Sequence, residues 1–514
     1  MKYFLTLIQL WVGFLSICAS YPKANIWIIP SVESPQVYRN YAQTSKVHLE
    51  MARGEVEHIQ LVFPSKVNEE YRFTFDRYLK GIQISARELK KMNGYYDALV
   101  PFKNQLKCTD TLTAVWITVQ CPSRVPVGKY HQTIKIEGSK HFTIQLDYNV
   151  HHTTIPLKSS IPITVGVENR CMTECLNDKE ADKERQRWVD FVLSYRMTPV
   201  FGTQITPERW QYEHSFSPWA WNDKRSIRLL NDRRYSCYML PFFTLSENEL
   251  ASLLCNIQKK GKLKESLFYI WDDPAYMEDY EQIKRKVNII RKYASDARIL
   301  TTFFCGPRNG PRKGDLYAVF DYLKHHIHVA TISLAPCKGN EEEVQHIRYK
   351  VPEGIDWWSY VCWQPGGNEP NFLLQMKGIQ QRAIMWRTWK NGSQGFLYWN
   401  CNIYHKRNPF TYITDMPHGD GILIYPGDIL GCKGPIASAR LERWRDGAEE
   451  MELLRLVEKN YSKEKADTLL NIVYSSPLSF IEKAHNIPFF RKELLDQLDK
   501  TIPIDYKLRI TDFI

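Results

Sequence analysis

The spacing of apolar and polar residues changes once along this chain, near Thr153. Before that point, short runs of β-branched and aromatic residues recur with turn residues between them. The run 113–119 alternates apolar and polar side chains, which is typical of a half-buried antiparallel strand. We therefore expect an N-terminal β-sandwich over residues 21–155.

After Thr153, apolar runs typical of buried strands alternate with amphipathic helical patterns. Eight such strands in βα alternation predict a (β/α)8, TIM-type barrel over residues 156–514, so the fold class is multi-domain β plus α/β. A doubly wound open sheet is the alternative, because periodicity does not show whether a sheet closes. The predicted strands are 161–167, 199–202, 236–241, 267–271, 299–305, 329–334, 355–362 and 396–399, and the predicted helices include 182–195, 247–259, 277–293, 372–390 and 437–459.

The first twenty residues have the layout of a secretory signal peptide. Met1-Lys2 supplies a positive charge, residues 3–17 are almost entirely apolar, and small residues follow up to Ser20. An uncleaved anchor is the alternative, although the apolar run is short for a membrane span. We expect cleavage after residue 20 and a secreted or lysosomal, lumenal protein without a membrane span.

Charge and cysteine content add two further expectations. The net charge is +11, but Lys and Arg are scattered among Asp and Glu, which disfavours nucleic acid as a partner. Twelve cysteines become eleven once Cys18 is removed, so at least one thiol is free or bonded between chains. Cys171 with Cys175, and Cys108 with Cys121, are candidate disulfides, and no second Cys/His pair supports a zinc site.

Two sequons fit a glycosylated protein of the secretory pathway. They begin at Asn391 and at Asn460. Such triplets also arise by chance, so they add little on their own.

The end of the fourth predicted barrel strand carries two adjacent carboxylates, Asp272 and Asp273. Active sites of βα barrels form where the strands end, and two close carboxylates raise the pKa of one of them. One group then holds a proton while the other stays ionised, as glycoside hydrolysis requires. The alternative is structural: Asp273 precedes Pro274 and could cap a helix.

Tryptophans cluster in the last two predicted strands and the helix between them. Their flat rings and single N–H donor suit the apolar faces of sugars. Trp386 and Trp389 follow helical spacing and are expected in the core, whereas Trp358 and Trp399 hold strand positions near the barrel mouth. We therefore take Trp358 and Trp399 as candidates for sugar contact.

Five stretches spread over the predicted mature chain resemble glycoside hydrolase family 123 and the related family of unknown function numbered 4091. The closing pair, with its ordered spacing, is specific, whereas the first stretch alone would be weak. The matching stretches are Arg53-Gly54-Glu55-Val56-Glu57-His58-Ile59-Gln60, Tyr269-Ile270-Trp271-Asp272-Asp273-Pro274, Gly395-Phe396-Leu397-Tyr398-Trp399-Asn400, Gly419-Asp420-Gly421-Ile422-Leu423-Ile424-Tyr425-Pro426-Gly427 and Ser438-Ala439-Arg440-Leu441-Glu442-Arg443-Trp444-Arg445-Asp446-Gly447.

This resemblance implies a retaining β-N-acetylgalactosaminidase that needs no cofactor and no metal. In such enzymes the 2-acetamido oxygen of the substrate attacks the anomeric carbon. An Asp orients the acetamido group, and the Glu after it protonates the leaving oxygen. By position, Asp272 matches the first role and Asp273 the second.

The resemblance implies further site residues by their position. Tyr398, Trp399 and Asn400 are expected to line the sugar pocket, and Tyr360 to hydrogen-bond the acetamido group or the oxazolinium-like intermediate. Tyr360 and Asn400 could equally be satisfied core polar groups. Arg387 and Arg440 are expected in structural ion pairs.

The chain departs from the pattern at Asp273, where the resemblance predicts Glu. Aspartate is shorter by about 1.5 Å, and a misplacement of about 1 Å costs on the order of 100-fold in rate. The backbone could compensate, another carboxylate such as Glu168 could serve, or the barrel could have kept only sugar binding. A catalytically impaired glycan-binding protein is thus the first alternative, and a metal-dependent hydrolase using the two aspartates is the second.

Overall fold

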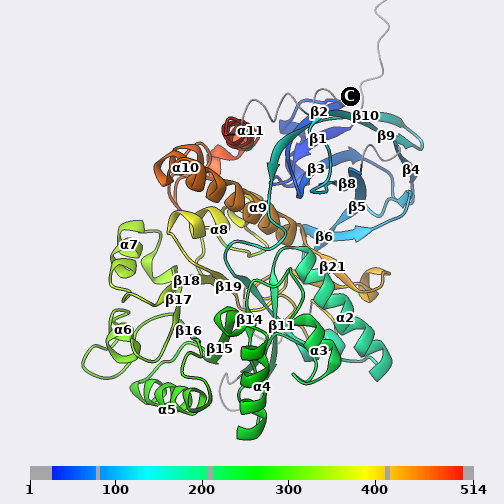
Figure 1. The fold of residues 1–514 in the computed structure, drawn as a ribbon. Helices are drawn as coiled ribbons and strands as arrows, with labels where there is room; N and C mark the ends of the chain where they lie inside the picture. Colours follow the sequence, from blue (N-terminus) through cyan, green and yellow to red (C-terminus); the bar gives the residue numbers. More distant parts are fainter. Residues whose placement is uncertain (1–25, 77–80, 205–211, 411–416, 502–514) are drawn as a thin grey trace, which may run out of the picture.

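The computed structural model describes residues 26–76, 81–204, 212–410 and 417–501. The predicted signal peptide, residues 1–20, lies outside them. The chain forms an all-β region at its N-terminal end and a larger α/β region, and helix α9 (Ala439–Asn460) runs between the two (Figure 1).

The N-terminal region consists of two five-stranded sheets that enclose an apolar core. This agrees with the predicted β-sandwich. The sheet orders are β1-β3-β8-β5-β6 and β2-β10-β9-β4-β7, with β1 (Trp27–Pro30), β2 (Lys46–Arg53), β3 (Glu55–Pro64), β4 (Glu70–Phe75), β5 (Gln83–Met92), β6 (Tyr95–Pro101), β7 (Gln105–Lys107), β8 (Leu112–Cys121), β9 (Gly128–Glu137) and β10 (His141–Thr154).

Strand β8 differs from its prediction, because it is buried on both faces and not on one. Val115 and Ile117 point into the sandwich core. Ala114 and Trp116 pack into the large core of the α/β region. The sheet that contains β8 therefore lies between two cores, and its outward positions are apolar for that reason.

The α/β region is built on a nearly closed, mixed sheet of nine strands. Eight of them are parallel to their neighbours and correspond to the eight predicted strands, whereas β13 pairs antiparallel with β12 and was not predicted. Beyond β13, the Phe216 N–H donates to the carbonyl oxygen of Met239 at 2.7 Å, which draws the two edges together. The order is β13-β12-β11-β19-β18-β17-β16-β15-β14, with β11 (Ile163–Glu168), β12 (Thr198–Gln204), β13 (Tyr212–Ser215), β14 (Tyr238–Met239), β15 (Ser266–Trp271), β16 (Ile299–Phe303), β17 (Val329–Ser333), β18 (Asp356–Val361) and β19 (Phe396–Tyr398); a separate hairpin joins β20 (Ile424–Pro426) and β21 (Pro435–Ala437).

Helices follow the strands, and two match the predicted bounds in full, α4 and α5. The predicted helix 372–390 starts six residues late, because the Asn371 side chain holds the preceding loop through the carbonyl oxygens of Cys362 and Pro365. Trp386 and Trp389 are buried, as predicted. The helices are α1 (Asn169–Thr173), α2 (Asp178–Ser194), α3 (Lys224–Leu229), α4 (Glu247–Lys259), α5 (Met277–Tyr293), α6 (Ala318–Leu323), α7 (Glu341–Tyr349), α8 (Gly378–Lys390), α9, α10 (Lys463–Leu470) and α11 (Ile487–Asp499), with short 3-10 turns at Pro35–Asn40, Leu263–Glu265, Ala335–Cys337, Asp428–Leu430 and Ile481–Asn486.

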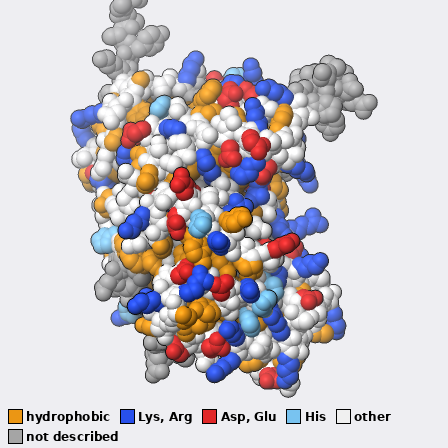
Figure 2. Space-filling view, turned by 90° about the vertical axis from the view of Figure 1, so that its left-hand side faces the viewer, with side chains coloured by type: hydrophobic (Ala, Val, Ile, Leu, Met, Phe, Trp, Pro, Cys, Tyr) orange, Lys and Arg blue, Asp and Glu red, His pale blue; other side chains and the backbone are white. Residues whose placement is uncertain are grey.

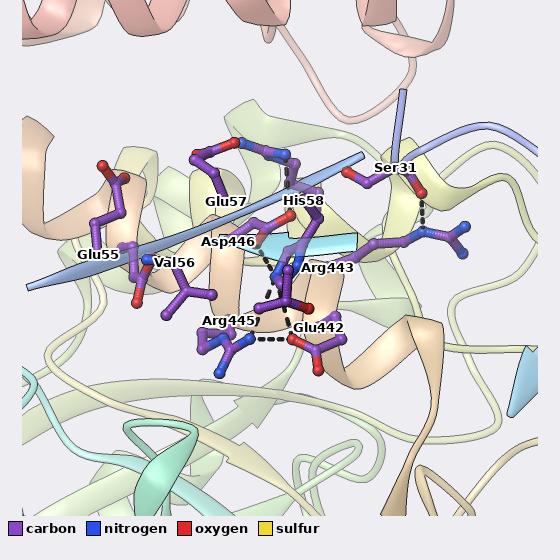
Figure 3. Close-up of polar contacts among 12 residues, drawn as sticks. Ser31, Glu55, Val56, Glu57, His58, Glu442, Arg443, Arg445 and Asp446 are labelled. Atoms are coloured by element: carbon purple, nitrogen blue, oxygen red, sulfur yellow. Dashed lines mark hydrogen bonds and ion pairs between the residues drawn. The ribbon is translucent and has the colours of Figure 1, made fainter. Parts of the chain in front are cut away.

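A buried polar network joins α9 to β3 (Figure 3). The His58 Nε2 lies 3.1 Å from a Glu442 oxygen and 3.3 Å from Asp446, while its Nδ1 accepts the indole N–H of Trp116. Glu442 also binds Arg87 at 2.6 Å. Because buried charges are stable only when paired, these contacts fix how the two regions meet.

The same network extends along both segments. The Arg443 Nε donates to the backbone oxygen of Ser31 at 2.7 Å, and the Val56 N–H donates to Glu449 at 3.0 Å (Figure 3). Two of the stretches that carry the family resemblance, 53–60 and 438–447, thus meet here although almost four hundred residues separate them. They serve the packing of the fold. The ion pairs predicted for Arg387 and Arg440 are also confirmed: Arg387 binds Glu341 and Glu369, and Arg440 binds Asp97.

A second polar contact attaches α11 to the sandwich. The two ring nitrogens of His151 lie 2.6 Å from Glu50 and 3.0 Å from Asp499. These carboxylates outweigh the effect of burial and raise the pKa of His151 to about 9. An imidazolium therefore joins the sandwich to the last described helix.

The eleven described cysteines are all free thiols, so both candidate disulfides are wrong. Cys171 is buried while Cys175 is exposed, and their side chains have different environments. Cys108 and Cys121 are both buried in the sandwich core without bonding to each other. Burial raises the pKa of Cys121 and Cys171 to about 12.

The charged residues on the surface are distributed as the sequence predicts, with both signs mixed. On the face shown in Figure 2, acidic and basic side chains are interspersed. None of the described helices is long and apolar enough to cross a membrane. Of the two sequons, Asn391 is buried at the end of α8, whereas Asn460 is exposed at the end of α9. Only Asn460 presents its amide to solvent in the folded chain.

Candidate active site

A cavity of about 60 Å³ lies where β11, β12, β15 and β19 end. Its wall combines aromatic rings with carboxyl and amide groups, which suits a polar ligand that has apolar faces. The lining residues that carry polar or aromatic side chains are Thr164, Glu168, His214, Tyr269, Asp272, Tyr398, Trp399 and Asn400. Of the predicted site residues, the cavity brings together Asp272, Tyr398, Trp399 and Asn400.

An irregularity in β15 directs Asp272 inward. The register of β15 against β16 shifts between Tyr269 and Trp271, which places one extra residue in β15. The ring of Trp271 instead lies against Lys286 on α5. The Tyr269 hydroxyl, three residues before Asp272, consequently donates to the Asp272 carboxylate at 2.7 Å.

The hydroxyl of Thr302, at the end of β16, bridges the two aspartates. It donates to Asp272 Oδ1 at 2.8 Å and accepts the backbone N–H of Asp273 at 2.9 Å. On the other side, the Tyr360 hydroxyl of β18 lies 2.9 and 3.0 Å from the two oxygens of Asp273. Side chains from β15, β16 and β18 thus hold the two aspartates in place.

Burial raises the pKa of both aspartates, and the two groups titrate as a pair. The charge of Asp272 raises the pKa of Asp273 further, to about 7, although the hydrogen bond from Tyr360 opposes this. Asp272 accepts from Tyr269 and Thr302, which favours its ionised form. Asp273 is therefore the member of the pair that holds a proton near neutral pH.

The helix-capping alternative for Asp273 is wrong. Helix α5 begins only at Met277, and its first turn is capped by Asp279, which accepts the N–H groups of Ala275 and Tyr276. Asp273 itself has a φ of 42°, in the left-handed region that L-residues rarely adopt. Such strain at a non-glycine residue is common at functional sites.

Trp399 and Tyr398 owe their orientation to a residue from another segment. The Asp420 Oδ1 accepts the Trp399 indole N–H at 2.9 Å and the Tyr398 hydroxyl at 3.1 Å. Trp399 is partly exposed, while Tyr398 is buried. Burial raises the pKa of Asp420 to about 6. Asp420 therefore positions the aromatic wall of the cavity.

Three predicted site residues, Asp273, Trp358 and Tyr360, are not among those that line the cavity. Trp358 is 1 % exposed in the packed interior of the sheet, where a Cβ on Gly395 would touch its ring, so it does not line the cavity. Tyr360 contacts the site only through Asp273. Asn400 lines the cavity and accepts the N–H of Asn402 at 2.9 Å.

Four residues of the site were missed in the sequence: Tyr269, Thr302, His214 and Asp420. Tyr269 and Asp420 stand in stretches that carry the resemblance, but their roles depend on the bulge and on a distant loop. The ring of His214 stacks on Tyr269 at 4.0 Å, and burial lowers its pKa to about 3, which keeps it neutral. Thr302 has no sequence signal, because only strand order brings it next to Asp272.

Within the described residues, no group of three or more His, Cys, Asp and Glu side chains is arranged to hold a metal ion. The cavity presents two carboxyl groups, Asp272 directly after β15 and Glu168 at the end of β11. Asp272 accepts hydrogen bonds from two hydroxyl groups, and Glu168 accepts one from a backbone N–H. The arrangement is therefore suited to proton transfer and hydrogen bonding.

Comparison with known proteins agrees with this picture. A search of curated proteins gave no match. A family 123 glycoside hydrolase from Clostridium perfringens, solved in a study of glycolipid glycan hydrolysis, has 14% identity and a TM-score of 0.64, and the match covers 95% of this chain and 100% of that one. A β-D-glucuronidase from Dictyoglomus thermophilum has 10% identity and a TM-score of 0.32, with 79% and 71% covered, which is too distant to carry an argument. The model of the glycoside hydrolase 123 catalytic domain matches residues 183–457, more than half of the chain. This protein belongs to glycoside hydrolase family 123.

Proposed function

We propose that this glycoside hydrolase removes terminal β-linked N-acetylgalactosamine with retention of configuration, through the 2-acetamido group of its substrate. The observation that carries the proposal is the aspartate pair, in which Thr302 bridges Asp272 to Asp273 and Asp273 has a pKa of about 7. One carboxylate and one carboxylic acid are the groups that this chemistry needs.

In the proposed reaction, Asp272 accepts a hydrogen bond from the acetamido N–H and orients its carbonyl oxygen toward the anomeric carbon. That oxygen forms a bond to the carbon while the glycosidic C–O bond breaks, and the leaving oxygen takes the proton of Asp273. Water then opens the oxazolinium-like intermediate, with Asp273 accepting a proton. The cavity of about 60 Å³ beside Asp272 is suited to part of a sugar, such as its acetamido group, more than to a whole ring.

The fold and the compartment complete the proposal. We propose that the nine-stranded sheet is a (β/α)8 barrel with β13 inserted at its mouth, since eight parallel strands run in a cyclic order. The chain is further proposed to enter the secretory pathway by a cleaved signal peptide and to act outside the cell or in the lysosome. N-terminal sequencing of the exported chain tests this, because a start at Met1 would contradict cleavage.

A specific observation favours the alternative of glycan binding without turnover. Both oxygens of Asp273 face one hydroxyl, that of Tyr360, and Asp273 is not among the residues that line the cavity. An acid that is both shorter than glutamate and held back from the cavity would protonate a leaving group slowly. The two functions differ in whether bound sugar is turned over.

The deciding experiment measures nitrophenol release from aryl β-N-acetylgalactosaminide, with the matching β-N-acetylglucosaminide and β-galactoside as controls. Turnover of the galactosaminide alone, lost in Asp273→Ala, is the expected result. Asp272→Asn serves as the second variant, because it keeps the volume of the side chain and removes its charge. If the natural chain is inactive and Asp273→Glu is active, the glycan-binding alternative is correct. Inactivity of both, without sugar binding, would reject both functions.

A further inference from the structure

The cavity contains a second carboxyl group that the aspartate mechanism does not use. Glu168 is the last residue of β11, is 6 % exposed, and lines the same cavity as Asp272. β11 and β15 are separated by four strands along one side of the sheet. Glu168 and Asp272 therefore reach the cavity from different walls.

The position of Glu168 is fixed by its backbone. The Asn402 side chain accepts the Glu168 N–H at 2.8 Å and donates to the Glu168 carbonyl at 3.0 Å. Two residues earlier, a Cβ at Gly166 would lie 1.9 Å from the Trp399 carbonyl oxygen, so only glycine allows β11 to approach the end of β19 this closely. Glu168 and the predicted sugar-contacting residue Trp399 are thus held as one unit.

The carboxyl group itself has little support from the protein. Oε1 accepts the backbone N–H of Arg170 at 3.1 Å. Among the residues that the structure describes, this is the one hydrogen bond to the Glu168 carboxyl group, and Glu168 forms no ion pair. Oε2 is not among the fully enclosed atoms that lack a partner, and Glu168 lines the cavity, so this oxygen is available to a ligand there.

We propose that Glu168 is a substrate-binding residue that donates a hydrogen bond from its neutral carboxyl group to a hydroxyl of the bound sugar. This inference rests on the proposed function and adds a contact on the wall opposite the aspartates. Neutral carboxyl groups both donate and accept, which suits a sugar hydroxyl. Burial raises the pKa of Glu168 to about 7, only partly offset by the N–H and the charge of Arg170, so the neutral form is populated under mildly acidic conditions.

Other titrating groups near Glu168 give different signals. The pKa of Cys171 on α1 is raised to about 12, and that of His214 on β13 is lowered to about 3, so both stay neutral from about pH 5 to about pH 9. Near the cavity, the aspartate pair and Asp420, whose pKa is about 6, titrate in or close to the same range, and a variant of Glu168 leaves these groups intact.

The test titrates free N-acetylgalactosamine into the full chain by ligand-observed NMR, at about pH 6 and about pH 8. In the natural chain, affinity should fall as pH rises, because the donor proton of Glu168 is lost. With a pKa of about 7, a contact made only by the neutral form accounts for up to about tenfold of that fall. Glu168→Gln keeps the acceptor for Arg170 and a permanent donor, so its affinity should depend less on pH.

Two further variants separate the possible failures. Glu168→Asp withdraws the carboxyl group and should weaken binding at both pH values, with thermal melting as the check on folding. Trp399→Ala should weaken sugar binding whether or not Glu168 contacts the sugar. Equal pH dependence in the natural chain and in Glu168→Gln would overturn the inference while leaving the proposed function intact. Absence of sugar binding in the natural chain would overturn both.

Discussion

The hydrogen bond from Tyr360 to Asp273 gives a prediction about the pH dependence of catalysis. The Tyr360 hydroxyl lies within 3.0 Å of both oxygens of Asp273 and lowers the pKa of that group, against the effects of burial and of Asp272. Tyr360→Phe removes this donor and keeps the buried ring. The ionised form of Asp273 is then less stable, and its pKa should rise above about 7.

The size of the shift follows from the strength of the bond. A hydrogen bond to a charged group contributes about 1.5–3 kcal/mol, and about 1.4 kcal/mol corresponds to one pKa unit. The pKa of Asp273 should therefore rise by about one to two units. Because the general acid works in its protonated form, the alkaline limb of kcat/KM should move to higher pH by the same amount.

Tyr269→Phe is the matched control. It removes the hydroxyl that donates to Asp272 and leaves the Thr302 donor in place. Asp272 works in its ionised form, so this variant should move the acid limb upward instead. Because the two aspartates titrate as a pair, neither limb of the pH profile belongs to one residue alone. The opposite responses of the two variants are therefore the evidence that Asp273 is the acid.

Carboxyl signals of ¹³C-labelled aspartate give the same shift by NMR if turnover is slow. An alkaline limb that stays in place in Tyr360→Phe, or equal effects of both Tyr→Phe variants on one limb, would refute the assignment of Asp273 as the acid.

Three further predictions concern groups around the site and the packing of the fold. The raised pKa of His151 adds up to about 3 kcal/mol to the free energy of unfolding below about pH 6.5, and this contribution is lost as the pH rises through about 9. His151→Gln should remove it, so the free energy of unfolding of the variant should depend less on pH over this range. Asp420→Ala removes the acceptor of the Trp399 indole N–H and should raise KM for the aryl galactosaminide about tenfold. Asp420→Asn keeps an acceptor at this position and should change KM little. Gly166→Ala should cost more than about 2 kcal/mol in denaturant unfolding, since its methyl group would overlap a carbonyl oxygen.

Much of the α/β region could be predicted because parallel strands buried on both faces leave short apolar runs between amphipathic helices. All eight predicted strands of the sheet are present. The strand β13, with the sequence Tyr-Glu-His-Ser, has no such run and could not be seen. Its pairing with β12 depends on contacts across the mouth of the sheet. The double burial of β8 was missed for a related reason, since alternation does not show what covers the outer face.

The candidate site was predictable to the extent that it follows from strand ends. Asp272, Tyr398 and Trp399 were placed by that rule, and the cavity contains them. The rule failed for Trp358, because a position inside the sheet faces either its packed interior or its mouth, and sequence spacing does not distinguish them. It also could not supply Thr302 and Tyr360 as partners of the aspartates, which requires the order β15-β16-β17-β18.

Three of the five stretches that resemble the family show two different tasks. Residues 53–60 and 438–447 form the buried network between the sandwich and the α/β region, where His58, Glu442 and Arg443 each have a partner. Residues 269–274 form the bulge and the aspartate pair. The departure from glutamate to Asp273 lies in the second group and leaves the first untouched. Resemblance in the packing segments therefore supports the fold, while the proposed reaction depends on whether Asp273, which does not line the cavity, can reach the leaving oxygen.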